Sequence, residues 1–163
     1  MRSLFISLLV VVLSACGFHL RGSYSLPWET IYITLPEFDV MRAEIKRHVE
    51  ASTQTRIVSD AKEARATLAI MRNDQLRSIL SLNAKGFVRE VQLTRIFAYK
   101  IVDANGKEIA APGNIVIQRE MTFDDEQLLA KGSEEGMIIR DMQSDLVQQL
   151  LRRLSAAKPL TDK

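Results

Sequence analysis

The segment NAKGFVREVQLTRIFAYKIVDANGK, residues 83–107, decides the fold. It begins with a turn signal, Asn83–Gly86, and ends with an Asn-Gly pair inside Asp103–Lys107. Short turns rich in Asn and Gly connect antiparallel strands. Between the turns, one parity class holds the apolar residues Phe87, Val91, Leu93, Phe97, Tyr99 and Ile101, with Arg89 and Arg95 as exceptions. This alternation predicts a long strand with one buried face.

Further long strands are predicted on both sides of this segment. Before the first turn, residues 66–82 carry one apolar parity class: Leu68, Ile70, Leu76, Leu80 and Leu82. Arg72, Asp74 and Ser78 interrupt that class, which indicates a solvated or bulged centre. After the second turn, alternation returns at Ile115, Ile117, Met121 and Phe123. Three consecutive strands joined by tight turns predict an antiparallel sheet.

The elements around these strands complete the fold class. Apolar and polar residues alternate over 30–35 and predict a strand. Asp39 is a candidate N-cap for a helix over 40–52, and residues 56–59 suit a short strand. Apolar positions four apart predict an amphipathic helix over 137–154. We expect an α+β fold: a mostly antiparallel or mixed sheet of about four long strands, with two helices packed on one face, in the order β-α-β-β-β-α.

The N-terminal residues predict export from the cytoplasm. Arg2 precedes ten mostly apolar positions, Leu4–Leu13. This run suits a signal peptide, because a membrane-spanning helix needs about 20 residues. We expect a lipoprotein signal peptide over 1–15, an acylated N-terminus and tether over 16–29, one α/β domain over 30–154 and a flexible tail over 155–163. An uncleaved N-terminal membrane anchor is the alternative for the apolar run.

Cys16 is the one cysteine of the chain. It follows Leu13-Ser14-Ala15, and this sequence resembles the bacterial lipobox. The resemblance implies cleavage before Cys16 and lipid attachment to its thiol and new amine. Gly17 is not an aspartate, which by resemblance to sorted lipoproteins favours the outer membrane. The alternative is a free or intermolecularly paired thiol.

Composition argues against several function classes. One cysteine and two histidines leave little for a metal cluster or a nucleophilic triad. The net charge of +2 does not predict nucleic-acid binding. Asp124–Glu126 offers paired carboxylates, but neighbouring residues point apart, so a surface turn is the better interpretation. We expect no catalytic residue, metal or cofactor.

Basic residues near the predicted turns are the candidate binding residues. Lys85 and Arg89 flank the first turn, and Arg77 lies near the same end if the strands pair around that turn. Lys131 is expected in a loop before the last helix, and it could approach Lys85 if the strand ending at Phe123 runs antiparallel to its neighbour. Such a cationic end would suit a phosphorylated lipid, whereas polar turns without a ligand are the ordinary alternative.

Two motifs resemble the LPS-assembly lipoproteins of the LptE family. CGFHLRG, residues 16–22, is similar to the start of the mature family members, and Leu129-Ala130-Lys131 followed by MIIRDM, residues 137–142, is similar to a second stretch. The resemblance implies an outer-membrane lipoprotein on the periplasmic side that plugs the LptD β-barrel, helps assemble it and binds lipopolysaccharide. It also implies that Lys131 contacts lipopolysaccharide, with Lys85 a less certain counterpart of the hairpin residue.

Two other hypotheses stay open at this stage. One is a stand-alone periplasmic lipid-binding lipoprotein without a barrel partner. The other is an enzyme that uses Asp124 or Glu126.

Overall fold

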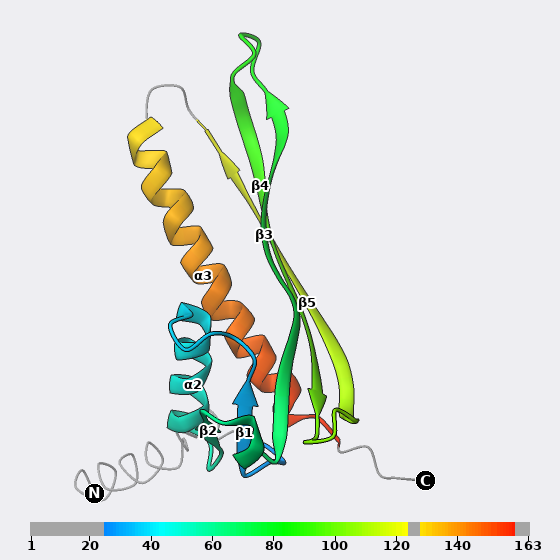
Figure 1. The fold of residues 1–163 in the computed structure, drawn as a ribbon. Coiled ribbons are helices and arrows are strands. Elements are labelled where there is room, and N and C mark those ends of the chain that lie inside the picture. Colours follow the sequence, from blue (N-terminus) through cyan, green and yellow to red (C-terminus); the bar gives the residue numbers. More distant parts are fainter. Residues whose placement is uncertain (1–24, 124–127, 159–163) are drawn as a thin grey trace, which may run out of the picture.

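The structure is a computed structural model that describes residues 25–123 and 128–158, with the backbone path alone for residues 128–131. In this part of the chain, five strands form one sheet in the order β2-β1-β3-β4-β5 (Figure 1). The strands are β1 (Thr30–Ile33), β2 (Arg56–Val58), β3 (Ala66–Leu82), β4 (Val88–Val102) and β5 (Glu108–Thr122). The helices are α2 (Val40–Ser52), the 3₁₀ turn η1 (Ala61–Glu63) and α3 (Leu128–Ser155).

The sheet is mixed, with three long strands and two short ones. β1 is parallel to β2 and to β3, whereas β3, β4 and β5 are successively antiparallel. The α+β class, the paired turns and the short strand β2 are therefore confirmed. The expected count of about four long strands is corrected: β1 is only four residues long because Pro36 and a turn end its pairing early.

Both helices cover the same face of the sheet, as predicted. α2 contributes Met41, Ile45 and Val49 to the core, and α3 contributes Met142, Leu146, Leu150 and Leu154. They pack against the odd-numbered residues of β4, including Phe97 and Ile101. Asp39 caps α2 as expected: its Oδ1 accepts hydrogen bonds from the backbone N–H groups of Met41 (2.8 Å) and Arg42 (3.2 Å).

α3 is much longer than the sequence indicated. The predicted start was Met137, but the helix begins at Leu128 and runs for 28 residues. Gly132 and Gly136 suggested a loop, and each glycine does cost a helix about 1 kcal/mol relative to alanine. Good helix formers surround both glycines, so the helix continues through them.

A bulge divides β3 into two segments of opposite parity. Ile70 pairs with Tyr99 but Arg72 pairs with Ala98, which leaves Met71 as an extra residue. Before the bulge, Leu68 and Ile70 face the helices; after it, Gln75 and Arg77 do, and Leu76 turns to the open face. The predicted central irregularity is thus confirmed, and the assignment of Leu68 and Leu76 to one face is wrong, because one inserted residue inverts the alternation.

Candidate functional site

The β3–β4 hairpin extends past the helix that covers the rest of the sheet (Figure 1). β3 has 17 residues, which span ~56 Å, whereas the 28 residues of α3 span ~42 Å. Val91 is the last fully buried residue of β4 on the way to the turn. We call residues 79–89, beyond that point, the hairpin tip.

Asn83 organises the turn of the hairpin tip. Its side-chain Oδ1 accepts hydrogen bonds from the backbone N–H groups of Lys85 and Phe87, both at 3.0 Å. Gly86 has φ +84°, a left-handed conformation that glycine adopts without a steric penalty. This local geometry fixes the turn that the sequence predicted, and it leaves the Lys85 side chain exposed.

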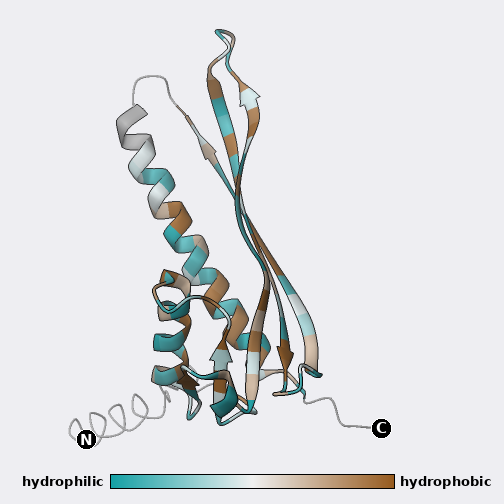
Figure 2. Cartoon of the chain, viewed as in Figure 1, coloured by the Kyte–Doolittle hydropathy of each residue, from teal (hydrophilic) through white to brown (hydrophobic). Residues whose placement is uncertain are grey.

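Large apolar side chains are exposed around this turn. Phe87 is 60% exposed, and Ile79, Leu80 and Leu82 are about half exposed. Figure 2 shows hydrophobic residues continuing along the hairpin beyond α3. Leu80, Leu82 and Phe87 belong to the predicted apolar parity classes but are not buried, because none of the described helices reaches them. The sequence carried a signal for this, since a predicted 18-residue helix spans only ~27 Å.

The four predicted lipopolysaccharide-binding residues lie in different surroundings. Lys85 and Arg89 are both exposed on the hairpin tip. Arg77 lies six positions before Asn83 along β3, where it pairs with Leu93 in register. The structure thus places Lys85 and Arg89 on the hairpin tip and Arg77 further down the hairpin.

Arg77 connects the sheet to α3. Its Nε lies 3.5 Å from Oε1 of Glu135, and its guanidinium lies 5.5 Å from the centroid of the Phe123 ring. Both groups of the ion pair are partly exposed, so solvent screens it and its contribution to stability is small. Sequence reasoning missed this contact because it treated residues 132–136 as a loop.

Lys131 belongs to the first turn of α3 and not to a loop, which corrects the expectation for it. Its side chain lies outside the described residues, as do the candidate carboxylates Asp124–Glu126 and the lipid-attachment candidate Cys16. The predicted approach of Lys131 to Lys85 depended on antiparallel pairing of β5 with β4. That pairing is present: Glu90 pairs with Thr122, and the Phe123 N–H donates to the Arg89 carbonyl at 2.7 Å. α3 therefore begins at the same end of the sheet as the hairpin tip.

Arg95 explains one exception in the apolar pattern of β4. Its Nη2 donates to Oδ1 of Asn73 at 2.6 Å, between the sheet and α2. Burial lowers the pKa of Arg95, and the charges of Asp39 and Asp74 oppose that shift. The Arg95 Nε and both amide atoms of Gln75, its register partner, are buried without a hydrogen-bond partner among the described residues. Unpaired buried polar atoms cost free energy, so this layer stabilises the fold less than the apolar core does.

Other kinds of site find no support in the described residues. Within residues 25–123 and 128–158, no group of three or more His, Cys, Asp or Glu side chains could hold a metal ion. None of the helices described is long and apolar enough to cross a membrane. The hairpin tip instead combines exposed cations with exposed apolar side chains, a pattern that suits an amphiphile with acidic groups.

Comparison with known proteins agrees with this architecture. A curated relative from Pectobacterium atrosepticum, named LPS-assembly lipoprotein LptE, is 27% identical over 93% of this chain and 83% of its own length. The solution structure of lipoprotein B from Nitrosomonas europaea is 38% identical, with a TM-score of 0.73 over 86% of this chain and 91% of that one. A minor lipoprotein from Acinetobacter baumannii, 23% identical with a TM-score of 0.68 over 84% of this chain and 99% of that one, shares the fold.

The family model described as LptE, lipopolysaccharide-assembly, matches residues 28–154, which include every helix and strand described above except the last residue of α3. The chain belongs to the LptE family of lipopolysaccharide-assembly lipoproteins.

Proposed function

We propose that this protein is an outer-membrane lipoprotein that plugs the LptD β-barrel, helps assemble it, and binds lipopolysaccharide on its way to the cell surface. Membership of the LptE family carries this proposal, because the match spans the whole folded domain. A family of lipopolysaccharide-assembly lipoproteins also argues for a binding role and against catalysis.

The hairpin tip supports the lipopolysaccharide-binding part of the proposal. Lipopolysaccharide is a multiply phosphorylated amphiphile. Lys85 and Arg89 can pair with phosphate groups through charge-assisted hydrogen bonds, which are about twice as strong as neutral ones. The exposed side chains of Leu82 and Phe87 lie beside these cations and can contact acyl chains. Lys131, in the first turn of α3, is the further cation that we assign to this site.

The open face of the sheet supports the barrel part of the proposal. Its upper half presents polar side chains from β4 and β5: Gln92, Thr94, Gln118, Glu120 and Thr122. The lumen of a large β-barrel is polar, so a plug must present polar surfaces to it. The polar rows of β4 and β5 meet this requirement, whereas Leu76 of β3, 44% exposed on the same face, is an apolar exception.

The place where the described domain begins supports anchoring through Cys16. β1 pairs with the first residues of β3, so the folded domain begins at the end of the sheet opposite the hairpin tip (Figure 1). A lipid attached at Cys16, nine residues before Ser25, would hold that end near the membrane and leave the tip pointing away from it. Two or three acyl chains suffice for stable anchoring, whereas one gives only marginal binding.

Co-purification tests the barrel assignment. The acylated full chain is extracted from outer membranes in mild detergent, and we expect a large β-barrel to remain bound to it. Recovery of the chain with lipopolysaccharide but without any barrel would overturn the plug and support the stand-alone lipid-binding lipoprotein.

Lipopolysaccharide binding is tested separately with charge-reversed variants. We expect the double substitution Lys85→Asp with Arg89→Asp, and the single substitution Lys131→Asp, to weaken binding at low salt while the fold survives, because each reverses a charge that faces phosphate. Arg56→Asp, at an exposed position of β2 in the opposite half of the molecule, is the matched control. Equal binding by all four proteins would refute the site.

A further inference from the structure

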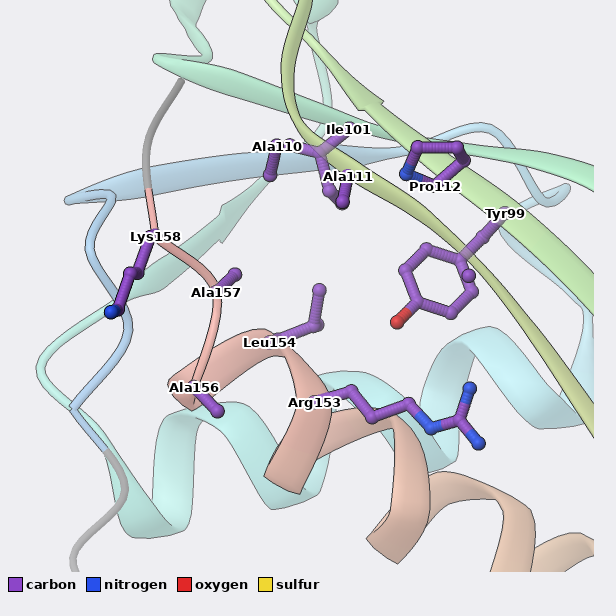
Figure 3. Close-up of a pocket in the computed structure, with 11 residues that line it drawn as sticks. Tyr99, Ile101, Ala110, Ala111, Pro112, Arg153, Leu154, Ala156, Ala157 and Lys158 are labelled. Atoms are coloured by element: carbon purple, nitrogen blue, oxygen red, sulfur yellow. The ribbon is translucent and has the colours of Figure 1, made fainter. Parts of the chain in front are cut away.

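A cavity lies at the other end of β4, where α3 ends (Figure 3). Its volume is about 390 Å³, at the lower end of the range of about 300–1,000 Å³ that is usual for small-molecule sites. β4 contributes Tyr99 and Ile101 to its lining, and the end of α3 contributes Arg153 and Leu154. The hairpin tip lies at the opposite end of β4, so the two sites are separate.

Local sequence features form this cavity. The pairing of β5 slips between Gly113, which pairs with Tyr99, and Ala110, which pairs with Ile101. Pro112 is tolerated here because β5 is an edge strand of the described sheet. A Cβ atom on Gly113 would lie 2.4 Å from Cζ of Tyr99, so only glycine allows the ring its position. The irregular strand edge and the missing side chain together leave room beside α3.

The lining of the cavity is apolar with a polar margin. Ile101, Ala110 and Leu154 are buried side chains that line it. Arg153 and the Tyr99 hydroxyl lie toward one side, and Lys158 lies on the other (Figure 3). Arg153 Nη1 donates to the Asn114 carbonyl at 2.7 Å, which fixes the guanidinium and leaves its other N–H groups available. Burial raises the pKa of Tyr99, with Arg153 opposing the shift. The phenol is protonated at neutral pH, as any tyrosine is, and can donate a hydrogen bond.

We propose that this cavity binds an anionic amphiphile, a molecule with one phosphate or carboxylate group on a short hydrocarbon stem. The described residues that line the cavity include the cations Arg153 and Lys158 and no acidic side chain, which favours an anionic ligand. The acid group faces Arg153 and the Tyr99 hydroxyl, and the stem lies over Leu154 and Ala110. A bare anion would leave the apolar lining in contact with water, which favours a ligand with both parts.

Titration of the full chain with hexyl phosphate tests the site. Calorimetry measures the affinity, and the amide NMR signals of Gly113 and Ala157 report where the ligand binds. Arg153→Gln weakens binding at least about tenfold, because it removes a charge-assisted hydrogen bond. Tyr99→Phe weakens it less, by roughly threefold, because it removes a hydrogen bond from an uncharged donor while the Arg153 charge remains. The matched control Arg152→Gln, at an exposed position that does not line the cavity, leaves the affinity unchanged.

Thermal unfolding of each variant shows whether the fold is intact. Absence of binding by the unsubstituted chain, equal affinity of the Arg153→Gln and Arg152→Gln variants, or equally tight binding of inorganic phosphate or hexanol overturns the proposal. Vesicles containing phosphatidylglycerol identify the source, provided that the Arg153→Gln and Arg152→Gln variants are compared, because the acylated N-terminus binds any bilayer. Weaker vesicle binding by Arg153→Gln supports a lipid headgroup as ligand, and an Arg153 effect on hexyl phosphate alone supports a soluble acid. Loss of this site leaves lipopolysaccharide binding by the hairpin tip unchanged, so the two proposals fail independently.

Discussion

The two halves of the sheet use the same strands for opposite purposes. In the packed half, around Phe97, Ile101 and Ile115, the face of the sheet toward the helices is covered by α2 and the end of α3, and these residues are almost fully buried. In the hairpin tip, β3 and β4 continue their pairing while Leu82 and Phe87 stay exposed. The antiparallel pairing of β3 with β4 continues into the tip, with register shifts between Ile79 and Leu82, and the helical cover does not.

This difference separates stability from recognition along a single strand. Burial of apolar area is the main source of stability, so the packed half holds the fold together. The hairpin tip contributes little burial and can therefore change its side chains without loss of the fold. The expected consequences of substitutions follow this division.

The largest expected effect comes from matched phenylalanine truncations in the two halves. Phe97 is 0% exposed, and Phe97→Ala should lower the free energy of unfolding by ~3–5 kcal/mol, because it removes buried area and leaves a cavity. Phe87→Ala should change it by less than ~0.5 kcal/mol, as at other surface positions. Urea unfolding followed by circular dichroism measures both, and similar losses would contradict the division.

Two glycines provide a second comparison. Gly113→Ala should cost ~1–3 kcal/mol, because the new methyl group would overlap the Tyr99 ring. Gly86→Ala should cost about 1 kcal/mol for a different reason, since φ is +84° there but the space is open. Asparagine tolerates this backbone conformation, so Gly86→Asn should recover much of the loss while Gly113→Asn should not. Thermal unfolding of the four variants decides whether packing or dihedral angle matters at each position.

A smaller effect is expected for the ion pair between Arg77 of β3 and Glu135 of α3. A double-mutant cycle with Arg77→Gln and Glu135→Gln should give a coupling energy below ~1 kcal/mol, because both groups are partly exposed. Added salt should reduce this coupling further. A coupling above ~2 kcal/mol that persists in salt would show that α3 is fixed to the hairpin more firmly than the geometry indicates.

The smallest effect at neutral pH is expected at Tyr99, where only alkaline conditions reveal a difference. Burial raises its folded-state pKa above the unfolded value of about 10. The contribution of the protonated Tyr99 phenol to the free energy of unfolding is fully present below pH 10 and is lost as pH rises through the folded-state pKa. Tyr99→Phe should leave the pH 7 stability nearly unchanged and reduce the loss above pH 10. Unfolding measured across this pH range checks the sign, and an equal alkaline loss in the variant would contradict it.

Local patterns in the sequence were sufficient for most of the fold. The Asn-Gly turns, the alternation in β4 and the Asp39 cap depend on neighbouring residues, so the sequence alone predicted them. Local patterns placed the start of α3 too late, because Gly132 and Gly136 indicated a loop. In the structure, the helix formers on both sides outweigh the cost of these two glycines. The face assignment of Leu76 failed because a bulge depends on how two strands pair.

The sequence alone pointed to the basic residues of the candidate site, but not to the helix contacts and the exposed apolar side chains around them. Lys85 lies in the turn and Arg89 lies at the start of β4, so their common location on the hairpin tip needed no tertiary information. The contact of Arg77 with Glu135 joins residues 58 positions apart and depends on where α3 lies. The exposure of Phe87 depends on the lengths of β3 and α3 relative to one another. The propensities of single residues do not give this difference in length.

The bulge at Met71 also has a consequence for mutation and descent. Because Met71 is the extra residue, its deletion would leave Ile70 opposite Tyr99 and Arg72 opposite Ala98, so regular alternation would place each later side chain on the face that it occupies now. Leu76 would stay on the open face, and Arg77 would stay on the face toward α3. Loss of this one codon therefore conserves both faces of β3, whereas loss of a codon for a paired residue of this strand would move the later side chains to the opposite face.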